Sequence, residues 1–147
     1  MDWTLFALRV CLATVAGLII GLEREIQGKE AGLKTNALVA LGASIFILMS
    51  VEFQGEKYVD ITRVLGQIVV GIGFIGAGTI LQKGNEVKGL TTAATIWCSA
   101  GAGCLAGFGM YTALGIICAI ILIINLAFGY VQHIIKKKKE KEETDSE

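Results

Sequence analysis

Apolar residues fall into long runs along the chain, and short polar segments separate these runs. Five runs stand out, at residues 5–22, 36–53, 64–81, 91–108 and 111–135. The first four contain about 18 residues, or about 27 Å of α-helix, which is close to the hydrocarbon thickness of a bilayer. No charged residue lies between Lys88 and Lys136, so that stretch has room for two spans. The pattern predicts an all-α integral membrane bundle of five transmembrane helices.

Basic residues between these runs predict the orientation of the bundle. Lysine and arginine gather in the first and third connections and in the tail, namely at Arg24, Lys29, Lys34, Lys83, Lys88 and residues 136–139. The second connection holds only Lys57 and Arg63. Because basic loops stay on the cytoplasmic side, we expect the N-terminus outside and the C-terminus in the cytoplasm. We expect a transmembrane domain over residues 1–135 and a charged, disordered cytoplasmic tail over residues 136–147.

Composition agrees with a membrane protein and offers little for catalysis. Hydrophobic residues supply 54% of the chain and charged residues 18%, below the roughly 25% of soluble domains. The four cysteines show no C-x-x-C spacing, and His133 is the single histidine. A Ser/His pair, a metal-ligand cluster and paired catalytic carboxylates are all missing from the sequence, so we expect no enzyme. We also expect no catalytic residue, no resident cofactor and no nucleic-acid partner.

One glycine motif invites a different interpretation. Residues 71–78, GIGFIGAG, match the G-x-G-x-x-G pattern of dinucleotide-binding loops. A dinucleotide-binding loop needs a preceding strand and an acidic residue about 20 positions later. Here the motif lies inside an apolar run, and no acidic residue follows at that distance. The glycines therefore indicate helix packing, because small residues let helix backbones approach closely in a membrane.

Small residues recur on several of the predicted helices. Residues 64–81 carry them on two faces, which predicts that this helix lies at the centre of the bundle. The following predicted helix has a ridge at four-residue spacing that runs from Thr91 to Gly107. The packing positions that we predict are Gly71, Gly73, Gly76, Gly78, Ser99 and Gly103. So much small-residue surface on short helices also predicts a homodimer.

Polar side chains gather at the two membrane edges. We expect a cytoplasmic-edge cluster formed by Glu23, Arg24, Lys34, Thr35, Asn85, Glu86, Thr91 and Thr92. The outer edge and one face of the third helix carry Arg9, Asp60, Arg63 and Gln67. Mg²⁺ needs oxygen ligands and often only one or two carboxylates, so either edge is a candidate for Mg²⁺. The alternative is that these side chains are anchoring charges and helix caps.

Arg9 lies about one helical turn inside the first run, where a charge is costly. It either reaches the outer headgroups or pairs with Asp60 or Glu52.

Three segments together resemble the membrane domain of the MgtC/SapB family. They are GLEREIQGKEAGLKTNALVALGASIF (21–46), DITRVLGQIVVGIGFIGAGTIL (60–81) and VKGLTTAATIWCSAGAG (87–103). The resemblance covers about residues 4–130. It implies a five-span, multi-pass protein of the bacterial inner membrane, tied to growth in low magnesium and, in some pathogens, to survival inside host cells.

The resemblance also implies which polar positions are characteristic. These correspond to Glu23, Arg24, Gly32, Lys34, Thr35, Asp60, Arg63, Gln67, Thr91, Thr92, Trp97 and Ser99. Two positions depart from the family pattern. Lys34 stands where members commonly have arginine, and Thr91 stands where some virulence-linked members have asparagine.

Two functions are compatible with these features. The first is a non-enzymatic accessory or regulatory protein in magnesium homeostasis that contacts another membrane complex, such as an ATP synthase or a cation transporter. The second is a small oligomeric transporter or channel for Mg²⁺ or another ion, in which the face with Asp60, Gln67 and Gln82 lines the path.

Overall fold

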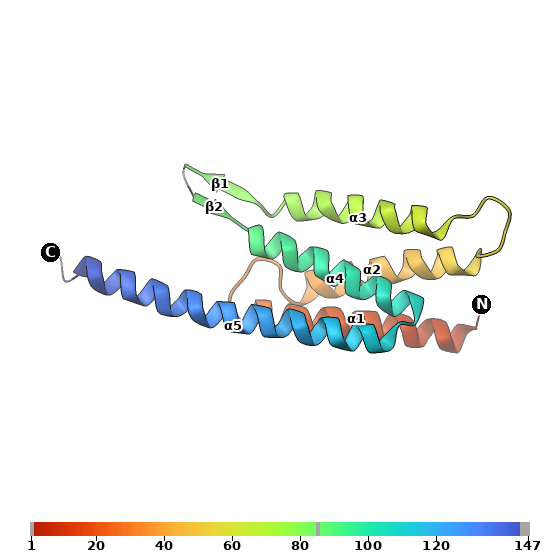
Figure 1. Ribbon diagram of the computed structural model, residues 1–147, viewed down its shortest axis with the longest axis horizontal. Helices are drawn as coiled ribbons and strands as arrows, with labels where there is room; N and C mark the ends of the chain where they lie inside the picture. The colour runs from red at the N-terminus through yellow and green to blue at the C-terminus, as the bar shows by residue number, and fades with distance from the viewer. Residues whose placement is uncertain (1, 85, 145–147) are drawn as a thin grey trace.

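The computed structural model describes residues 2–84 and 86–144. Over this part the chain forms five helices and one antiparallel hairpin (Figure 1). The elements are α1 (Trp3–Ile26), α2 (Leu33–Glu52), α3 (Ile61–Ala77), β1 (Leu81–Lys83), β2 (Glu86–Lys88), α4 (Leu90–Phe108) and α5 (Tyr111–Thr144). The predicted all-helical class is therefore confirmed. Because α5 is continuous to Thr144, no helix end marks the domain boundary that we predict at residue 135, and this boundary stays a prediction.

Carboxylates begin two of the helices. Asp2 precedes α1 and accepts hydrogen bonds from the backbone N–H groups of Thr4 and Leu5, at 2.9 and 3.3 Å. Asp60 does the same for α3 through the backbone N–H of Thr62, at 2.9 Å. The Thr62 hydroxyl and backbone N–H both donate to Asp60, and these bonds hold the pKa of its carboxyl below the ordinary value. Both residues act as N-caps.

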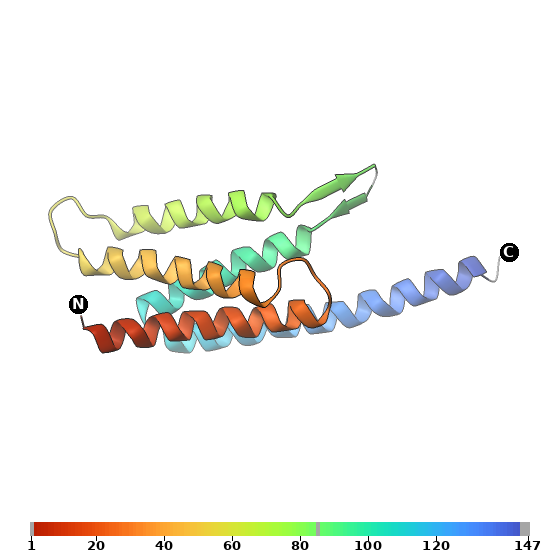
Figure 2. The same cartoon turned by 180° about the vertical axis from the view of Figure 1, so that it is seen from behind.

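The helix at the centre of the bundle is α4. It contributes Ala102 and Ala106 to a core shared with α1 and α5, and Ala100 and Cys104 to a second core shared with α2. In Figures 1 and 2, α3 runs along one edge of the bundle, opposite α1 and α5. In α3, Gly76 is the one buried residue. The prediction that residues 64–81 form the centre is therefore wrong for the single chain.

Glycines bring α1 and α4 close to the backbone of α2. A Cβ added at Gly17 would lie 2.5 Å from the carbonyl oxygen of Asn36, and one at Gly21 would lie 2.7 Å from that of Gly32. On the side facing α4, a Cβ at Gly103 would overlap the carbonyl oxygen of Ala40. Glycine is needed at these positions because any side chain would push the helices apart.

The glycines of α3 lie in different surroundings. Added Cβ atoms at Gly71 and Gly73 would meet nothing within 4 Å, and one at Gly76 would make ordinary contact with Ala93 at 3.5 Å. Gly78 follows the helix end and faces the carbonyl oxygen of Ile75 from its own last turn. Small residues permit close packing without requiring it, so the glycine pattern did not locate the neighbours of α3.

The predicted third span extends too far. The helix ends at Ala77, and residues Leu81–Lys83 instead pair with Glu86–Lys88 as a two-stranded hairpin, in which Leu81 lies opposite Lys88. Gln82 is consequently in a strand and does not extend the polar face of α3. The sequence did contain a hairpin signal, since the Gly84-Asn85 dipeptide separates two short segments.

Large apolar side chains cover the outside of the bundle, whereas alanine and glycine fill much of its interior. Phe74, Val70 and Ile123 are 84%, 68% and 65% exposed. Two helices, α1 and α2, are long and apolar enough to cross a membrane by length and composition. The apolar segments Ile61–Ala77 and Tyr111–Ala127 are shorter.

The close contact at Gly103 yields a stability prediction. Gly103→Ala should lower the thermal unfolding temperature of the detergent-solubilised protein, because relieving the overlap with Ala40 costs about 1–3 kcal/mol. Gly101→Ala, two residues away on the same helix, is the matched control because its added Cβ would meet nothing within 4 Å. Equal unfolding temperatures for the two variants would contradict this arrangement of α4 against α2.

Candidate functional site

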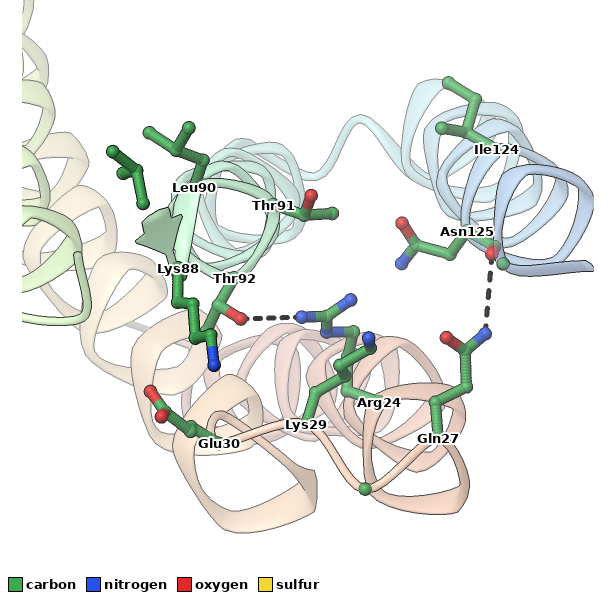
Figure 3. Close-up of a pocket in the computed structure, with 14 residues that line it drawn as sticks. Arg24, Gln27, Lys29, Glu30, Lys88, Leu90, Thr91, Thr92, Ile124 and Asn125 are labelled. Atoms are coloured by element: carbon green, nitrogen blue, oxygen red, sulfur yellow. Dashed lines mark hydrogen bonds between the residues drawn. The ribbon is translucent and has the colours of Figure 1, made fainter. Parts of the chain in front are cut away.

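A cleft of about 660 Å³ lies at the end of the bundle that holds the α1–α2 connection and the hairpin. Its walls are the end of α1, the connection after it, the residues from β2 into α4, and the middle of α5. The polar side chains in its lining include those of Arg24, Gln27, Lys29, Lys88, Thr92 and Asn125 (Figure 3). Three of these are cationic. Glu30 is the one acidic residue in the lining.

The end of α1 fixes two of the cations. Gly28 adopts a left-handed conformation with φ of +64°. Its N–H donates to the Glu25 carbonyl at 3.0 Å, and the Lys29 N–H donates to the Arg24 carbonyl at 3.0 Å. This is the Schellman arrangement, which favours glycine at the left-handed position. It ends the helix at Ile26, so Arg24 lies in the last turn and Lys29 just beyond the helix end, and both line the cleft.

Arg24 is the most deeply buried charge at this end, with 2% of its surface exposed. Its Nη2 donates to the Thr92 hydroxyl at 2.7 Å and so links α1 to α4. Its Nε is buried and has no hydrogen-bond partner. Among the described side chains, no carboxylate lies within ion-pair distance of the guanidinium. A buried charge that is only partly hydrogen-bonded is costly, because desolvation is incompletely offset.

Glu23 lies beside this cleft on the preceding position of α1 and is 6% exposed. Its Oε1 accepts a hydrogen bond from Gln27, and its Oε2 is buried without a partner. The same Gln27 amide also donates to the backbone carbonyl of Asn125, at 3.4 Å. Gln27 therefore connects the carboxylate on α1 to α5.

The start of α4 forms the opposite wall. Gly89 precedes the helix with φ of +88°, and an added Cβ would overlap the carbonyl oxygen of Thr79. A side chain is thus excluded where the hairpin leads into α4. No side chain caps the helix start, and Leu90, Thr91 and Thr92 all line the cleft. The first N–H groups of a helix and its positive end favour an anion.

The structure brings together only part of the predicted cytoplasmic-edge cluster. Arg24, Thr91 and Thr92 line the cleft, and Glu23 lies next to it. Lys34 and Thr35 belong to the first turns of α2, outside the lining, and Lys34 is exposed. Glu86 lies in exposed β2, 3.4 Å from Lys88. Asn85 lies outside the described residues.

Ser99, predicted as a packing position, takes part in a buried polar contact. Its hydroxyl donates to Asn36 Oδ1 at 2.8 Å, and both residues are 0% exposed. The Asn36 Nδ2 group donates to the carbonyls of Ala31 and Gly32, at 2.8 and 2.9 Å. This side chain therefore fixes the start of α2 as well as its contact with α4.

At the other end, Arg9 makes a contact that the sequence did not predict. Its Nη1 donates to the carbonyl of Gly107 at 2.9 Å, so it binds the last turn of α4. Asp60 is bound to Thr62 and acts as the cap of α3. Arg63 and Gln67 are exposed on α3, and Gln67 also borders an apolar cleft between α2 and α3. These outer-edge residues therefore do not form one cluster.

Sequence reasoning missed the contribution of α5. Asn125 and Gly129 complete the cleft, although more than 95 positions separate each of them from Gln27. Asn125 is a lone amide within an apolar run, which is a signal for a polar contact inside the bundle. Its Nδ2 is buried and has no partner. Among the described residues, no group of three histidine, cysteine, aspartate or glutamate side chains is placed to hold a metal ion.

The fold and the site together define a class of protein. Small residues inside, large apolar residues outside, and polar groups gathered at the helix ends are the organisation of a helical membrane protein. The chain belongs to the MgtC family, whose family model matches residues 10–134.

Several relatives support this assignment. Protein MgtC of Salmonella typhimurium is 43% identical over 141 residues, which is 92% of this chain and 60% of the relative. An uncharacterized protein of Synechocystis sp. is 43% identical over 127 residues, covering 86% of this chain and 53% of the relative. Protein MgtC of Brucella abortus is 45% identical over 117 residues, covering 78% and 48%. The chain thus spans about half the length of the curated relatives it matches. No solved structure matches it.

The link between Arg24 and Thr92 yields a second prediction. Thr92→Val keeps the side-chain shape but removes the acceptor of a hydrogen bond from a buried charge, so it should cost about 1.5–3 kcal/mol. Thermal unfolding in detergent measures this loss. Thr91→Val is the matched control, because Thr91 is exposed at the neighbouring position. Two variants of equal stability would show that the bond does not hold α1 against α4.

Proposed function

We propose that this chain is a non-enzymatic accessory or regulatory protein in magnesium homeostasis that acts by contacting another membrane complex. Membership of the MgtC family and the absence of catalytic motifs in the sequence support this role. An ATP synthase or a cation transporter is the kind of partner that we propose. We also propose a homodimer, since the glycines at positions 71 and 73 leave room on α3 for a second copy.

The observation that carries the proposal is the pair of buried charges beside an open cleft. Glu23 and Arg24 are neighbours on α1, and each has a buried polar atom without a partner. Helix packing does not require such groups, because apolar residues of similar volume can fill the space at lower cost. Ionisable groups at membrane helices are commonly functional. We therefore place the contact with a partner or ligand at this cleft.

The alternative is an ion transporter with the polar face of α3 along the path. That face is not enclosed by a single chain, because α3 is the outermost helix and Asp60 and Gln82 are exposed. Gln67 borders a cleft whose other lining is apolar. The arrangement favours the accessory role.

We further propose five crossings of the bacterial inner membrane, with the N-terminus outside. In Figures 1 and 2, the N-terminus, the α2–α3 connection and the α4–α5 turn lie towards one end. The hairpin and the C-terminal part of α5 lie towards the other end, with the α1–α2 connection between them and the middle of the bundle. Alternating ends are what five successive crossings require. The basic connections then face the cytoplasm.

This orientation predicts the result of cysteine labelling. In a cysteine-free background, single cysteines at Lys57 and Lys83 should react with a membrane-impermeant reagent from opposite sides of the membrane. Both positions are exposed, so burial does not limit their reactivity. Labelling of both from one side in intact cells would rule out the proposed crossing by α3.

The role of Glu23 predicts a separation of folding from function. Glu23→Gln keeps the size of the side chain and its contact with Gln27 but removes the charge. It should therefore accumulate normally and fail to restore growth in low magnesium to a strain lacking this gene, giving growth at the level of the empty vector. The assay is complementation at matched protein levels.

Glu86→Gln is the control for that experiment, because Glu86 is a largely exposed carboxylate that lies outside the cleft lining. Full complementation by Glu23→Gln would show that the charge of this buried carboxylate is not needed for function.

A transport assay separates the two candidate functions. In liposomes containing the wild-type protein and a Mg²⁺-sensitive dye, the accessory role predicts no Mg²⁺ influx beyond that of liposomes without the protein. Protein-dependent influx would support the transporter instead.

A further inference from the structure

The cleft contains two buried hydrogen-bond donors that lack acceptors. Arg24 Nε and Asn125 Nδ2 approach it from different helices, α1 and α5, and both atoms are without a partner. Buried polar groups in folded proteins are almost always hydrogen-bonded. Both unpaired groups in the lining are donors, so their missing partner is an acceptor, while the unpaired Glu23 Oε2 lies outside the lining. Figure 3 shows the Arg24 guanidinium and the Asn125 amide pointing into the space between α1, α4 and α5.

Most of the charges that line this space are positive. Arg24, Lys29 and Lys88 line the cleft, and Glu30 is the one opposing residue in the lining. Glu86 lies 3.4 Å from Lys88, but both side chains are more than 70% exposed, so this pair holds Lys88 only weakly. The uncapped start of α4 adds its N–H groups and the positive helix end on the same side. Together these features favour an anion.

We propose that the cleft binds the phosphate group of an organic phosphate. Arg24, Asn125 and the start of α4 supply hydrogen-bond donors, and Lys29 and Lys88 supply charge. A volume of about 660 Å³ is far larger than one phosphate needs, and it falls in the range of small-molecule sites. Leu90 and Ile124 offer apolar contacts for the rest of such a ligand.

Two sources share this chemistry. One is the headgroup of an anionic phospholipid, since the cleft lies at the ends of apolar helices whose outer faces carry exposed residues such as Ile120 and Leu126. The other is a soluble phosphate ester. This inference rests on the proposed function in one respect, because it places the ligand at the same cleft. Binding is measured on the purified protein, so the result does not depend on the growth assay.

The test uses the full chain and two arms. In detergent, glycerol 3-phosphate is added at constant ionic strength; in nanodiscs, phosphatidylglycerol replaces part of a phosphatidylcholine bilayer. Thermal unfolding is followed in both. We expect a rise in unfolding temperature that depends on the phosphate concentration or the phosphatidylglycerol fraction. A rise in the first arm identifies a soluble ester as a ligand, and a rise confined to the second identifies the lipid headgroup.

Variants make the result specific. Lys88→Gln should weaken ligand binding about fivefold, so that more phosphate or phosphatidylglycerol is needed for the same rise in unfolding temperature. This is the loss expected from one cationic contact near a membrane surface. Lys34→Gln is the matched control, an exposed lysine outside the cleft lining, and should leave the effect unchanged. Asn125→Leu removes a donor that has no partner, so it should weaken the effect without destabilising the protein alone.

No stabilisation in either arm would overturn the inference, as would equal responses of Lys88→Gln and Lys34→Gln. Those outcomes leave the accessory role intact if Glu23→Gln still fails to complement. Conversely, phosphate-dependent stabilisation together with full complementation by Glu23→Gln would support the binding site and contradict the proposed function.

Discussion

The rest of the structure depends on how closely two helices approach the backbone of α2. Gly17 and Gly21 bring α1 against one side, and Gly103 brings α4 against the other. In lipid the hydrophobic effect does not drive helices together, so such backbone contacts and a few buried hydrogen bonds must do so. The spacing set by these glycines allows Ser99 to reach Asn36 and Arg24 to reach Thr92. A separation greater by one methyl group would break both bonds.

The polar cleft follows from the same packing. With α1, α2 and α4 held together, the ends of α1 and α4 meet, and α5 closes the remaining side through the contact of Gln27 with the Asn125 backbone. The start of α4 supplies N–H groups without a side-chain cap, and the buried Arg24 adds positive charge. Charge in such a place interacts more strongly with a ligand than charge on an exposed surface does. The cleft is therefore a product of the helix arrangement and needs no separate domain.

The sequence predicted the helices better than it predicted their neighbours. Apolar runs and connections located all five, because helix length in a membrane is set by bilayer thickness. The position of α3 was not predictable, since glycines on two faces are compatible with a central helix and with an outer one. Glu23, Arg24 and Thr92 could be grouped from the shared end of their helices. Asn125 could not, because its distance along the chain from α1 gives no information about tertiary contact.

The bond between Asn36 and Ser99 also constrains biosynthesis. These residues are 63 positions apart, and all of α3 is synthesised between them. At about 5–20 residues per second, Asn36 waits for roughly 3–13 s before its partner exists. The α1–α2 pair must therefore persist without this bond until α4 has been made. Until then the Asn36 Nδ2 group can bind the carbonyls of Ala31 and Gly32, but its Oδ1 lacks the donor that Ser99 later supplies.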